Sequence, residues 1–185
     1  LKNPDVKFFP IERKGFPFDT LLRFEIFLQA EELLKDCDYV FYFNANILFN
    51  NPVLESDILP DESQEGLVCA NHPIISRYNK DAYPYERNPS SLAYIKDGDG
   101  YAYVQGALIG GTSDAFIRMS KILAENIRRD LQKNIVAIWH DESHLNRYIL
   151  DKTPKLLPIE FLCPNTRKYR NRCKSEIKIL LLEKE

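Results

Sequence analysis

The densest cluster of reactive side chains in this sequence is the run from Trp139 to His144, which reads Trp-His-Asp-Glu-Ser-His. It places an aromatic ring, two carboxylates and two imidazoles within six residues, where we expect a helix to begin. In one interpretation, Asp141 and Glu142 only stabilise the first helical turn, because the positive end of the helix dipole favours acidic side chains there. In the other, the run carries out chemistry, and two kinds of chemistry fit the residue types.

The first kind is zinc binding. His140 and His144 are four residues apart and would share one face of a helix, so both imidazoles could coordinate one ion. The metalloprotease motif, however, has Glu directly after its first His, and here that position is Asp141. The second kind is glycosyl transfer. A carboxylate such as Glu142 can stabilise or attack an anomeric carbon, while the Trp139 ring packs on the apolar face of a sugar.

A second polar group, Asn44-Ala45-Asn46, directly follows the aromatic and β-branched run 39–43. Such a run is typical of a strand buried on both faces of a parallel sheet. The triplet would then lie at the carboxyl end of a strand, where open α/β sheets bind their ligands. Because asparagine is also common in turns, the triplet either contacts a ligand or only closes a turn.

The elements that must position these clusters alternate between strands and helices, which predicts an α/β fold and a single domain, 1–185. The polar segment 75–100 is rich in Tyr, Pro, Asn and Asp and indicates a long functional loop. Gly110 and Gly111 are expected to end the strand before them. The expected strands are 6–11, 39–43, 67–70, 101–108 and 177–182, and the expected helices are 19–34, 113–134 and 140–151.

Composition limits the class of protein. The 185 residues are 44% hydrophobic and 28% charged with a net charge of -2, which is typical of a soluble globular domain and disfavours nucleic acid as a partner. No run of 18 apolar residues exists and the first ten residues lack the layout of a signal peptide, so we expect a cytoplasmic location or a peripheral one at the inner membrane surface. The four cysteines show no metal-ligand spacing and are expected to be reduced.

The run Trp139 to Asn146, Trp-His-Asp-Glu-Ser-His-Leu-Asn, resembles the signature of family 6 glycosyltransferases, the family of the blood-group A and B transferases and α-1,3-galactosyltransferases. The resemblance extends over residues 16–162. Further segments agree in the same order: 22–24, 38–46, 72–73, 85–87, 93–95 and 106–111.

This resemblance implies a GT-A type fold, with a mainly parallel twisted sheet flanked by helices and with the family's N-terminal strands missing. It implies retaining transfer of galactose or N-acetylgalactosamine from a UDP-sugar, in α-1,3 linkage, to a galactose-containing oligosaccharide or lipid-linked glycan. A non-catalytic glycan- or nucleotide-binding relic of the family is the alternative. The implied site residues are Glu142 as the catalytic carboxylate, Arg23, Asn44, Asn46, Gln105, Gly106, Ala107 and Asp141 at the donor, and His72, Trp139 and Glu142 at the acceptor.

Two further expectations concern the charge of the donor. Asn44 and Asn46 replace the Asp-x-Asp of most members, as in bacterial members that work without metal, so no divalent metal and no other cofactor is expected. The basic stretch 167–174 is either a solvated loop or, like the family's C-terminal segment, a set of cations that neutralises the diphosphate.

Overall fold

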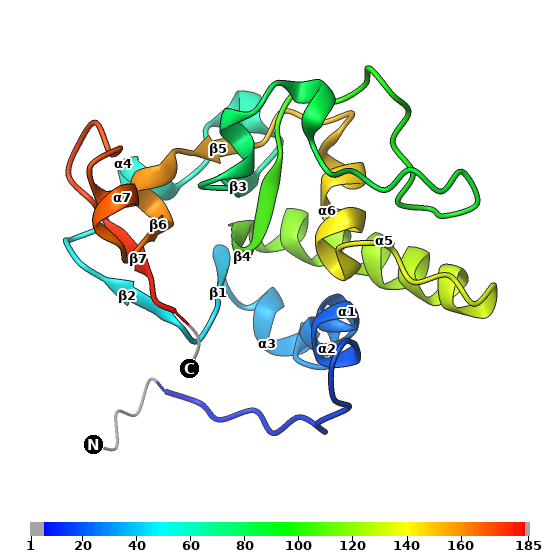
Figure 1. Ribbon diagram of the computed structural model, residues 1–185. Coiled ribbons are helices and arrows are strands. Elements are labelled where there is room, and N and C mark those ends of the chain that lie inside the picture. The colour runs from blue at the N-terminus through cyan, green and yellow to red at the C-terminus, as the bar shows by residue number, and fades with distance from the viewer. Residues whose placement is uncertain (1–5, 184–185) are drawn as a thin grey trace.

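The computed structural model describes residues 6–183, and the predicted domain's first five and last two residues lie outside them. Two small sheets are accompanied by helices (Figure 1). The strands are β1 Tyr39–Phe43, β2 Ile47–Phe49, β3 Leu67–Asn71, β4 Val104–Thr112, β5 Lys155–Leu157, β6 Cys163–Pro164 and β7 Ile179–Leu181.

The longest helix is α5, and it confirms the amphipathic pattern predicted for 113–134. Among residues 6–183, no helix is long and apolar enough to cross a lipid bilayer. The helices are α1 Phe18–Leu21, α2 Arg23–Leu28, α3 Glu31–Lys35, α4 Glu55–Ile58, α5 Ser113–Gln132, α6 His140–Ile149 and α7 Arg167–Arg170, and short 3-10 helices cover Glu62–Gln64, Ile75–Arg77, Lys80–Ala82 and Ile159–Phe161.

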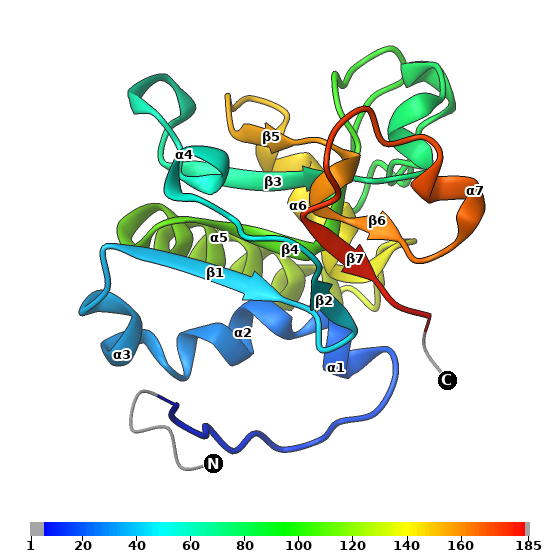
Figure 2. The same cartoon turned by 90° about the vertical axis from the view of Figure 1, so that its left-hand side faces the viewer.

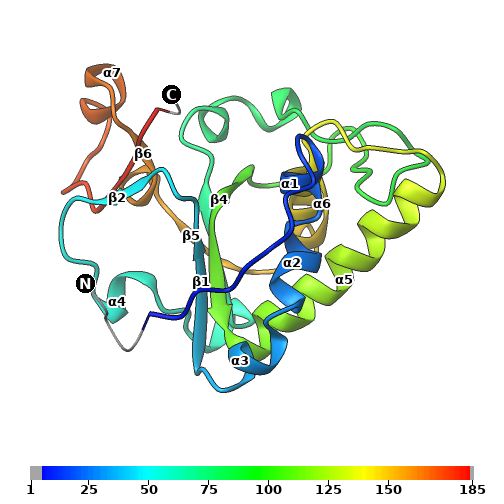
Figure 3. The same cartoon turned by 90° about the horizontal axis from the view of Figure 1, so that it is seen from below.

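The first sheet, in the order β1-β4-β3-β5, lies between two layers (Figure 3). Helices α1, α2, α5 and α6 cover one face, and the second sheet, β2-β7-β6, lies beyond the other. Successive side chains of β3 point to opposite faces of the sheet. Leu67 and Cys69 pack with the helices, whereas Val68 and Ala70 pack toward the second sheet. Both faces of the sheet are therefore apolar.

The prediction of a mainly parallel sheet is wrong. Strand β4 lies between β1 and β3 and runs antiparallel to both (Figure 2), and only β3 and β5 pair in parallel within this sheet. The reason is the connection between β3 and β4. It is the long loop and not a crossover helix, so the chain returns in the opposite direction.

The prediction that run 39–43 is a strand buried on both faces of a parallel sheet is right for the two faces and wrong for the parallel pairing. Strand β1 lies at the sheet edge with β4 as its one neighbour among the described residues, and Tyr39 is exposed. Its aromatic run nevertheless has a cause, because Val40 and Tyr42 pack on the helical layer while Phe41 and Phe43 pack on the opposite one.

Two local predictions near the N-terminus need correction. Residues 6–11 form no strand, and Val6, Phe8 and Ile11 are exposed because no neighbouring strand pairs with them. The single helix expected over 19–34 is divided into α1, α2 and α3. The three helices still bury the predicted apolar face, because Leu21 and Phe24 are buried and Leu34 packs against the same cluster.

Gly110 and Gly111 do not end a strand but lie inside β4. A Cβ on Gly110 would come within 2.3 Å of the Phe41 ring, and one on Gly111 within 1.9 Å of the Gly66 carbonyl oxygen. The two glycines therefore mark close contacts of β4 with its neighbours on both sides.

The predicted long loop is ordered and contains two 3-10 turns. Its Tyr83, Tyr85 and Ile95 form a buried cluster with Tyr103, the residue before β4. Glu86 fixes the loop from the other side, because its Oε2 accepts a hydrogen bond of 2.7 Å from the Ile138 N–H. The loop is thus held against the segment that leads into α6.

Candidate active site

A cavity of about 190 Å³ brings together almost all the predicted site residues. Its walls come from five places: α1, the start of α2, the end of β1, the first half of β4 and the start of α6. The lining residues are Thr20, Arg23, Asn44, Gln105, Gly106, Ala107, Trp139, His140, Asp141 and Glu142. A neighbouring cavity of about 550 Å³ shares Thr20, Arg23 and Asn44 and adds Asn46.

Strand β4 contains a β-bulge where it lines this cavity. Cys69 of β3 pairs with Ile109, yet the next residue, Ala70, pairs with Gln105, so residues 106–108 are released from β3. The backbone N–H of Asn44 donates to the Ala107 carbonyl at 3.0 Å, which holds the bulge against the end of β1. Bulges are common next to active sites because they redirect the chain, and here the bulge exposes both backbone groups of Gly106 to side chains of the cavity.

Arg23 connects three of these elements. Its Nη1 lies 3.1 Å from Asp141 Oδ2 and donates to the Gly106 carbonyl, and its guanidinium lies 4.8 Å from the centre of the Tyr42 ring. A Cβ at position 106 would lie 2.7 Å from that same Nη1. Glycine at 106 therefore leaves the room that the arginine needs.

Asp141 and Glu142 are two acidic side chains at one buried place. Burial raises the pKa of Asp141 to about 6, against the opposing effects of Arg23 and of the backbone N–H groups at the helix start. Burial also raises the pKa of Glu142 to about 7, although its Oε2 accepts a hydrogen bond of 3.1 Å from the Gly106 N–H. Displaced carboxyl pKa values in a cleft are typical of catalytic sites.

Tyr103 is a neighbour of Glu142 that sequence reasoning missed. Its hydroxyl is buried without a hydrogen-bond partner among the described residues. Burial and the Glu142 carboxylate raise the pKa of Tyr103, and the hydroxyl lowers that of Glu142 in return. The phenol thus remains protonated and lies near the carboxylate.

The helix-capping interpretation of the acidic pair is only partly right. The N–H groups at the start of α6 lower the pKa of Asp141, so the helix end does favour this carboxylate. Glu142, in contrast, points to β4 and not to its own helix. His140 has a φ of 52°, a strained conformation for a residue with a side chain, and such strain is common at functional sites.

The placement of the two histidines does not support the zinc interpretation. The His140 ring packs edge-on against Phe16 at a centroid distance of 5.2 Å. His144 is buried, with its Nε2 3.7 Å from Asp130 Oδ2. The two imidazoles have different neighbours, and residues 6–183 hold no group of three His, Cys, Asp or Glu side chains that could bind a metal ion.

The two asparagines after β1 are held in different ways. Asn44 Oδ1 accepts a hydrogen bond of 2.7 Å from the Tyr42 hydroxyl, which also places Tyr42 beside the site. Asn46 Nδ2 donates to the Leu182 carbonyl at 2.6 Å, and its Oδ1 is buried without a partner among the described residues. Tyr42 could have been predicted, because residues two apart on a strand share a face.

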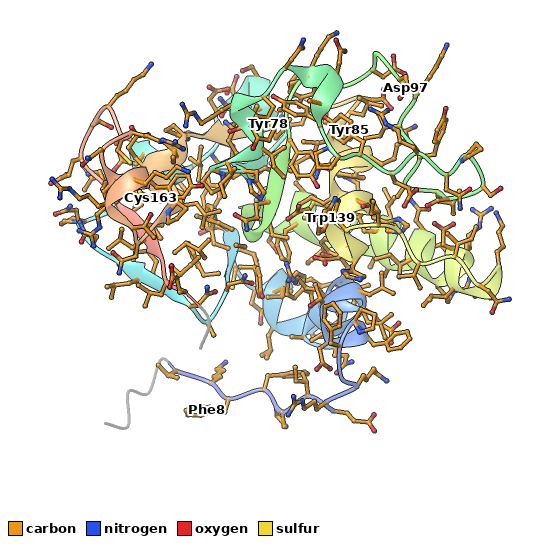
Figure 4. The ribbon with its side chains drawn as sticks, viewed as in Figure 1. Phe8, Tyr78, Tyr85, Asp97, Trp139 and Cys163 are labelled. Atoms are coloured by element: carbon orange, nitrogen blue, oxygen red, sulfur yellow. The ribbon has the colours of Figure 1, made fainter. Side chains whose placement is uncertain are left out.

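Of the two aromatic acceptor candidates, only Trp139 lines the cavity. It is 47% exposed at the start of α6, between the loop that carries Tyr85 and the helices near the N-terminus (Figure 4). His72 lies outside the cavity. Its Nδ1 accepts from the N–H groups of Ile74 and Ile75 at 3.2 Å, burial lowers its pKa to about 4, and its ring meets Tyr103.

The basic stretch 167–174 is partly the helix α7, and it lines neither cavity of the candidate site. Its Lys168, Arg172 and Lys174 line other cavities instead, together with Arg77 of the long loop. The interpretation that this stretch neutralises the diphosphate therefore gains no support from its position.

The chain is similar in sequence to known glycosyltransferases. The sequence model of glycosyltransferase family 6 matches residues 21–185. The O-antigen biosynthesis glycosyltransferase WbnI of Escherichia coli is 32% identical over 98% of this chain and 74% of its own length. The globoside alpha-1,3-N-acetylgalactosaminyltransferase 1 of Gallus gallus is 37% identical over 72% of this chain and 37% of its own, and the histo-blood group ABO system transferase 2 of Rattus norvegicus is 38% identical over 49% and 28%.

The chain thus spans about three quarters of the bacterial relative and well under half of these vertebrate ones. The family match covers the helix that carries Arg23, the β4 bulge and the Trp139 to Glu142 run. This chain belongs to glycosyltransferase family 6.

Proposed function

We propose that this chain transfers galactose or N-acetylgalactosamine from UDP, with retention and in α-1,3 linkage, to a galactose-containing glycan on a GT-A type fold. The observation that carries the proposal is the pair of buried carboxylates, Asp141 and Glu142, set against the Gly106 bulge beside an exposed tryptophan. Relatives support the sugar class by name, since they include an α-1,3-N-acetylgalactosaminyltransferase and an ABO transferase.

The two carboxylates have separate roles in this proposal. Asp141, neutralised by Arg23, accepts hydrogen bonds from hydroxyls of the donor sugar. Glu142 faces the anomeric carbon as the bond to UDP breaks and the UDP oxygen keeps the bonding electrons. The carboxylate then either bonds to that carbon, forming a glycosyl-enzyme that the acceptor hydroxyl displaces, or stabilises the positive charge during a front-side displacement. In both routes the acceptor hydroxyl loses its proton to the phosphate oxygen of the departing UDP. Either route retains configuration, and Trp139 provides the surface on which the acceptor sugar packs.

The donor is expected to be UDP-galactose in preference to UDP-N-acetylgalactosamine. Gln105 and Ala107 flank Gly106 in the cavity and narrow the space for an acetamido group. Because a pocket of this kind discriminates by about 1 to 3 kcal/mol, the expected preference is about 10- to 200-fold in kcat/KM. Competition between the two donors for one galactoside acceptor, with the anomeric configuration of the product read by NMR, tests both donor and retention. A preference for N-acetylgalactosamine would reverse the donor assignment, and an inverted product would contradict the mechanism.

Transfer is expected to continue without a divalent metal. Manganese or magnesium that bridges a diphosphate prefers anionic oxygen ligands, whereas Asn44 and Asn46 offer only neutral carboxamides. The Oδ1 of Asn46, which has no partner among residues 6–183, can instead accept a hydrogen bond from the donor. Activity in excess EDTA should equal activity with added manganese. Loss of activity in EDTA and its recovery on addition of manganese would refute metal independence. If an Asn46→Ala variant keeps the same affinity for the donor, this asparagine serves only to close a turn.

A further inference from the structure

A second pair of cavities lies away from the candidate active site. Their volumes are about 590 and 250 Å³, and both are lined by Arg77 and Arg172. Lys174 adds to the larger cavity and Lys168 to the smaller. We call the place defined by these four cations the basic cleft. It lies between the loop that follows β3, where Tyr78 is labelled in Figure 4, and the segment around α7 (Figure 2).

The cations of the basic cleft are not neutralised within the described chain. None of the four forms an ion pair with a carboxylate of residues 6–183. Glu160 is the one acidic side chain that lines the cleft, and its Oε1 accepts instead from the backbone N–H groups of Lys174 and Ser175, at 2.6 and 3.3 Å. The cleft therefore carries a surplus of positive charge.

Two of the four cations lie over an aromatic ring. The Arg172 guanidinium lies 4.8 Å from the centre of the Tyr169 ring, and the Lys168 ammonium lies 5.7 Å from it. An aromatic face positions a cation without cancelling its charge. Two arginines lining one concave place can bind an oxyanion through several N–H donors at once.

The position of the cleft relates it to the acceptor side of the candidate active site. Asn71 and Pro73 line the larger cavity, and His72 lies between them in sequence. The His72 N–H donates to the Tyr103 carbonyl at 2.8 Å, and the two rings meet at a centroid distance of 5.8 Å. Tyr103 in turn neighbours Glu142. The donor-side residues Arg23 and Asn44 line neither cavity of the cleft.

We propose that the basic cleft is an acceptor subsite that binds an anionic group on the glycan, either the carboxylate of an acidic sugar or a phosphate ester. The proposal rests on the proposed function, because only a transferase has an acceptor. It adds the chemical class of that acceptor: the galactose to be modified lies near Trp139 and Glu142, while a charged group farther along the glycan binds Arg77 and Arg172.

The test compares two double variants of the full chain. Arg77→Gln/Arg172→Gln removes the shared cations, and Arg129→Gln/Lys133→Gln, at the exposed end of α5, removes the same charge elsewhere. Transfer from UDP-galactose is measured to lactose, to a galactosyl-glucuronic acid disaccharide and to lactose carrying a phosphate ester. We expect at least one acidic acceptor to have a kcat/KM at least tenfold above that of lactose. This advantage should disappear in the cleft variant, persist in the control and return in part with Arg77→Lys/Arg172→Lys.

Direct binding separates this proposal from the proposed function. Glucuronate and inorganic phosphate, titrated by NMR, should bind the unmodified chain at least tenfold more tightly than the cleft variant, and release of UDP from UDP-galactose without acceptor should be equal in both. If neither the unmodified chain nor any variant releases UDP from UDP-galactose, with or without an acceptor, the proposed function fails. The titrations then still decide whether the cleft binds anions. Equal use of neutral and acidic acceptors would overturn the subsite. So would Arg77- and Arg172-dependent binding to phosphatidylglycerol vesicles with unchanged acidic-acceptor kinetics, since the cleft would then be a membrane contact.

Discussion

Replacing Glu142 with Gln is expected to lower the rate of glycosyl transfer by about 100- to 1000-fold, the usual effect of removing one group that stabilises transition-state charge. The substitution keeps the size of the side chain, and the amide oxygen can still accept from the Gly106 N–H that Glu142 Oε2 uses at 3.1 Å. Folding should therefore survive while the charge beside the anomeric carbon is lost. Steady-state kcat with UDP-galactose and a galactoside measures the effect.

The same variant should be more stable than the unmodified chain at alkaline pH. Burial raises the pKa of Glu142 from an ordinary 4.5 to about 7, so the folded chain binds more protons than the unfolded chain between these pH values. The stability of the unmodified chain must then fall as pH rises through this window, whereas glutamine does not titrate. We expect Glu142→Gln to gain about 1 to 3 kcal/mol at pH 8 and nothing at pH 4, by urea denaturation.

The rate of transfer should also depend on the ionisation of Glu142, but it should fall as pH decreases, whereas stability falls as pH increases. If ionised Glu142 is required, kcat/KM of the unmodified chain falls about tenfold per pH unit below a pKa of about 7. Glu62→Gln, on an exposed 3-10 turn, is the matched control and should change neither rate nor stability. Near-normal turnover of Glu142→Gln would contradict the catalytic role, and unchanged stability at pH 8 would contradict the displaced pKa.

Replacing Arg23 with Met is expected to destabilise the fold by about 3 to 5 kcal/mol at pH 8, because it leaves a buried carboxylate without its partner. The side chains of Arg23 and Asp141 are 12% and 3% exposed, and their closest atoms are 3.1 Å apart. The same substitution at Arg128, whose 2.8 Å ion pair with Glu125 is half exposed, should cost no more than about 1 kcal/mol.

The loss of stability caused by Arg23→Met should depend on pH and on the presence of Asp141. Arg23 lowers the pKa of Asp141, so without it this pKa lies above about 6, and the destabilisation should fade as pH falls toward about 6. Adding Asp141→Asn to Arg23→Met should recover most of the stability at pH 8, since no buried charge remains. An additive double variant would show that the pair is not coupled. Arg23→Met should also impair transfer, because it frees the Gly106 carbonyl and the Tyr42 ring from the guanidinium.

The part of the site that is contiguous in sequence could be predicted from its residue types, whereas distant members such as Arg23 were predicted only through the family resemblance. The run Trp139 to Glu142 is contiguous, and the family pattern identifies it directly. Arg23, by contrast, is unremarkable by itself. Its importance comes from the fold, which brings the start of α2 to the start of α6 and to a bulge of β4.

The same limit explains the errors in the fold. The alternation of Leu67 to Ala70 and the periodicity of Ser113–Gln132 are properties of single segments, and these elements were predicted correctly. Strand direction depends on how segments are connected, and nothing within the run 39–43 distinguishes an edge strand covered on both sides from a central one. Tyr103 gives no signal either, because its role depends on Glu142 being folded next to it.

The hydrogen bonds of Gly106 have a consequence for how this enzyme family can diversify. The residue that holds the reactive machinery does so with its main chain alone: its N–H supports Glu142 and its carbonyl supports Arg23. Its neighbours Gln105 and Ala107 carry side chains that line the candidate site. If the proposed function holds, substitutions at these two flanking positions change the sugar that fits while Glu142 and Arg23 remain anchored, so that one scaffold can move between donors without passing through an inactive intermediate.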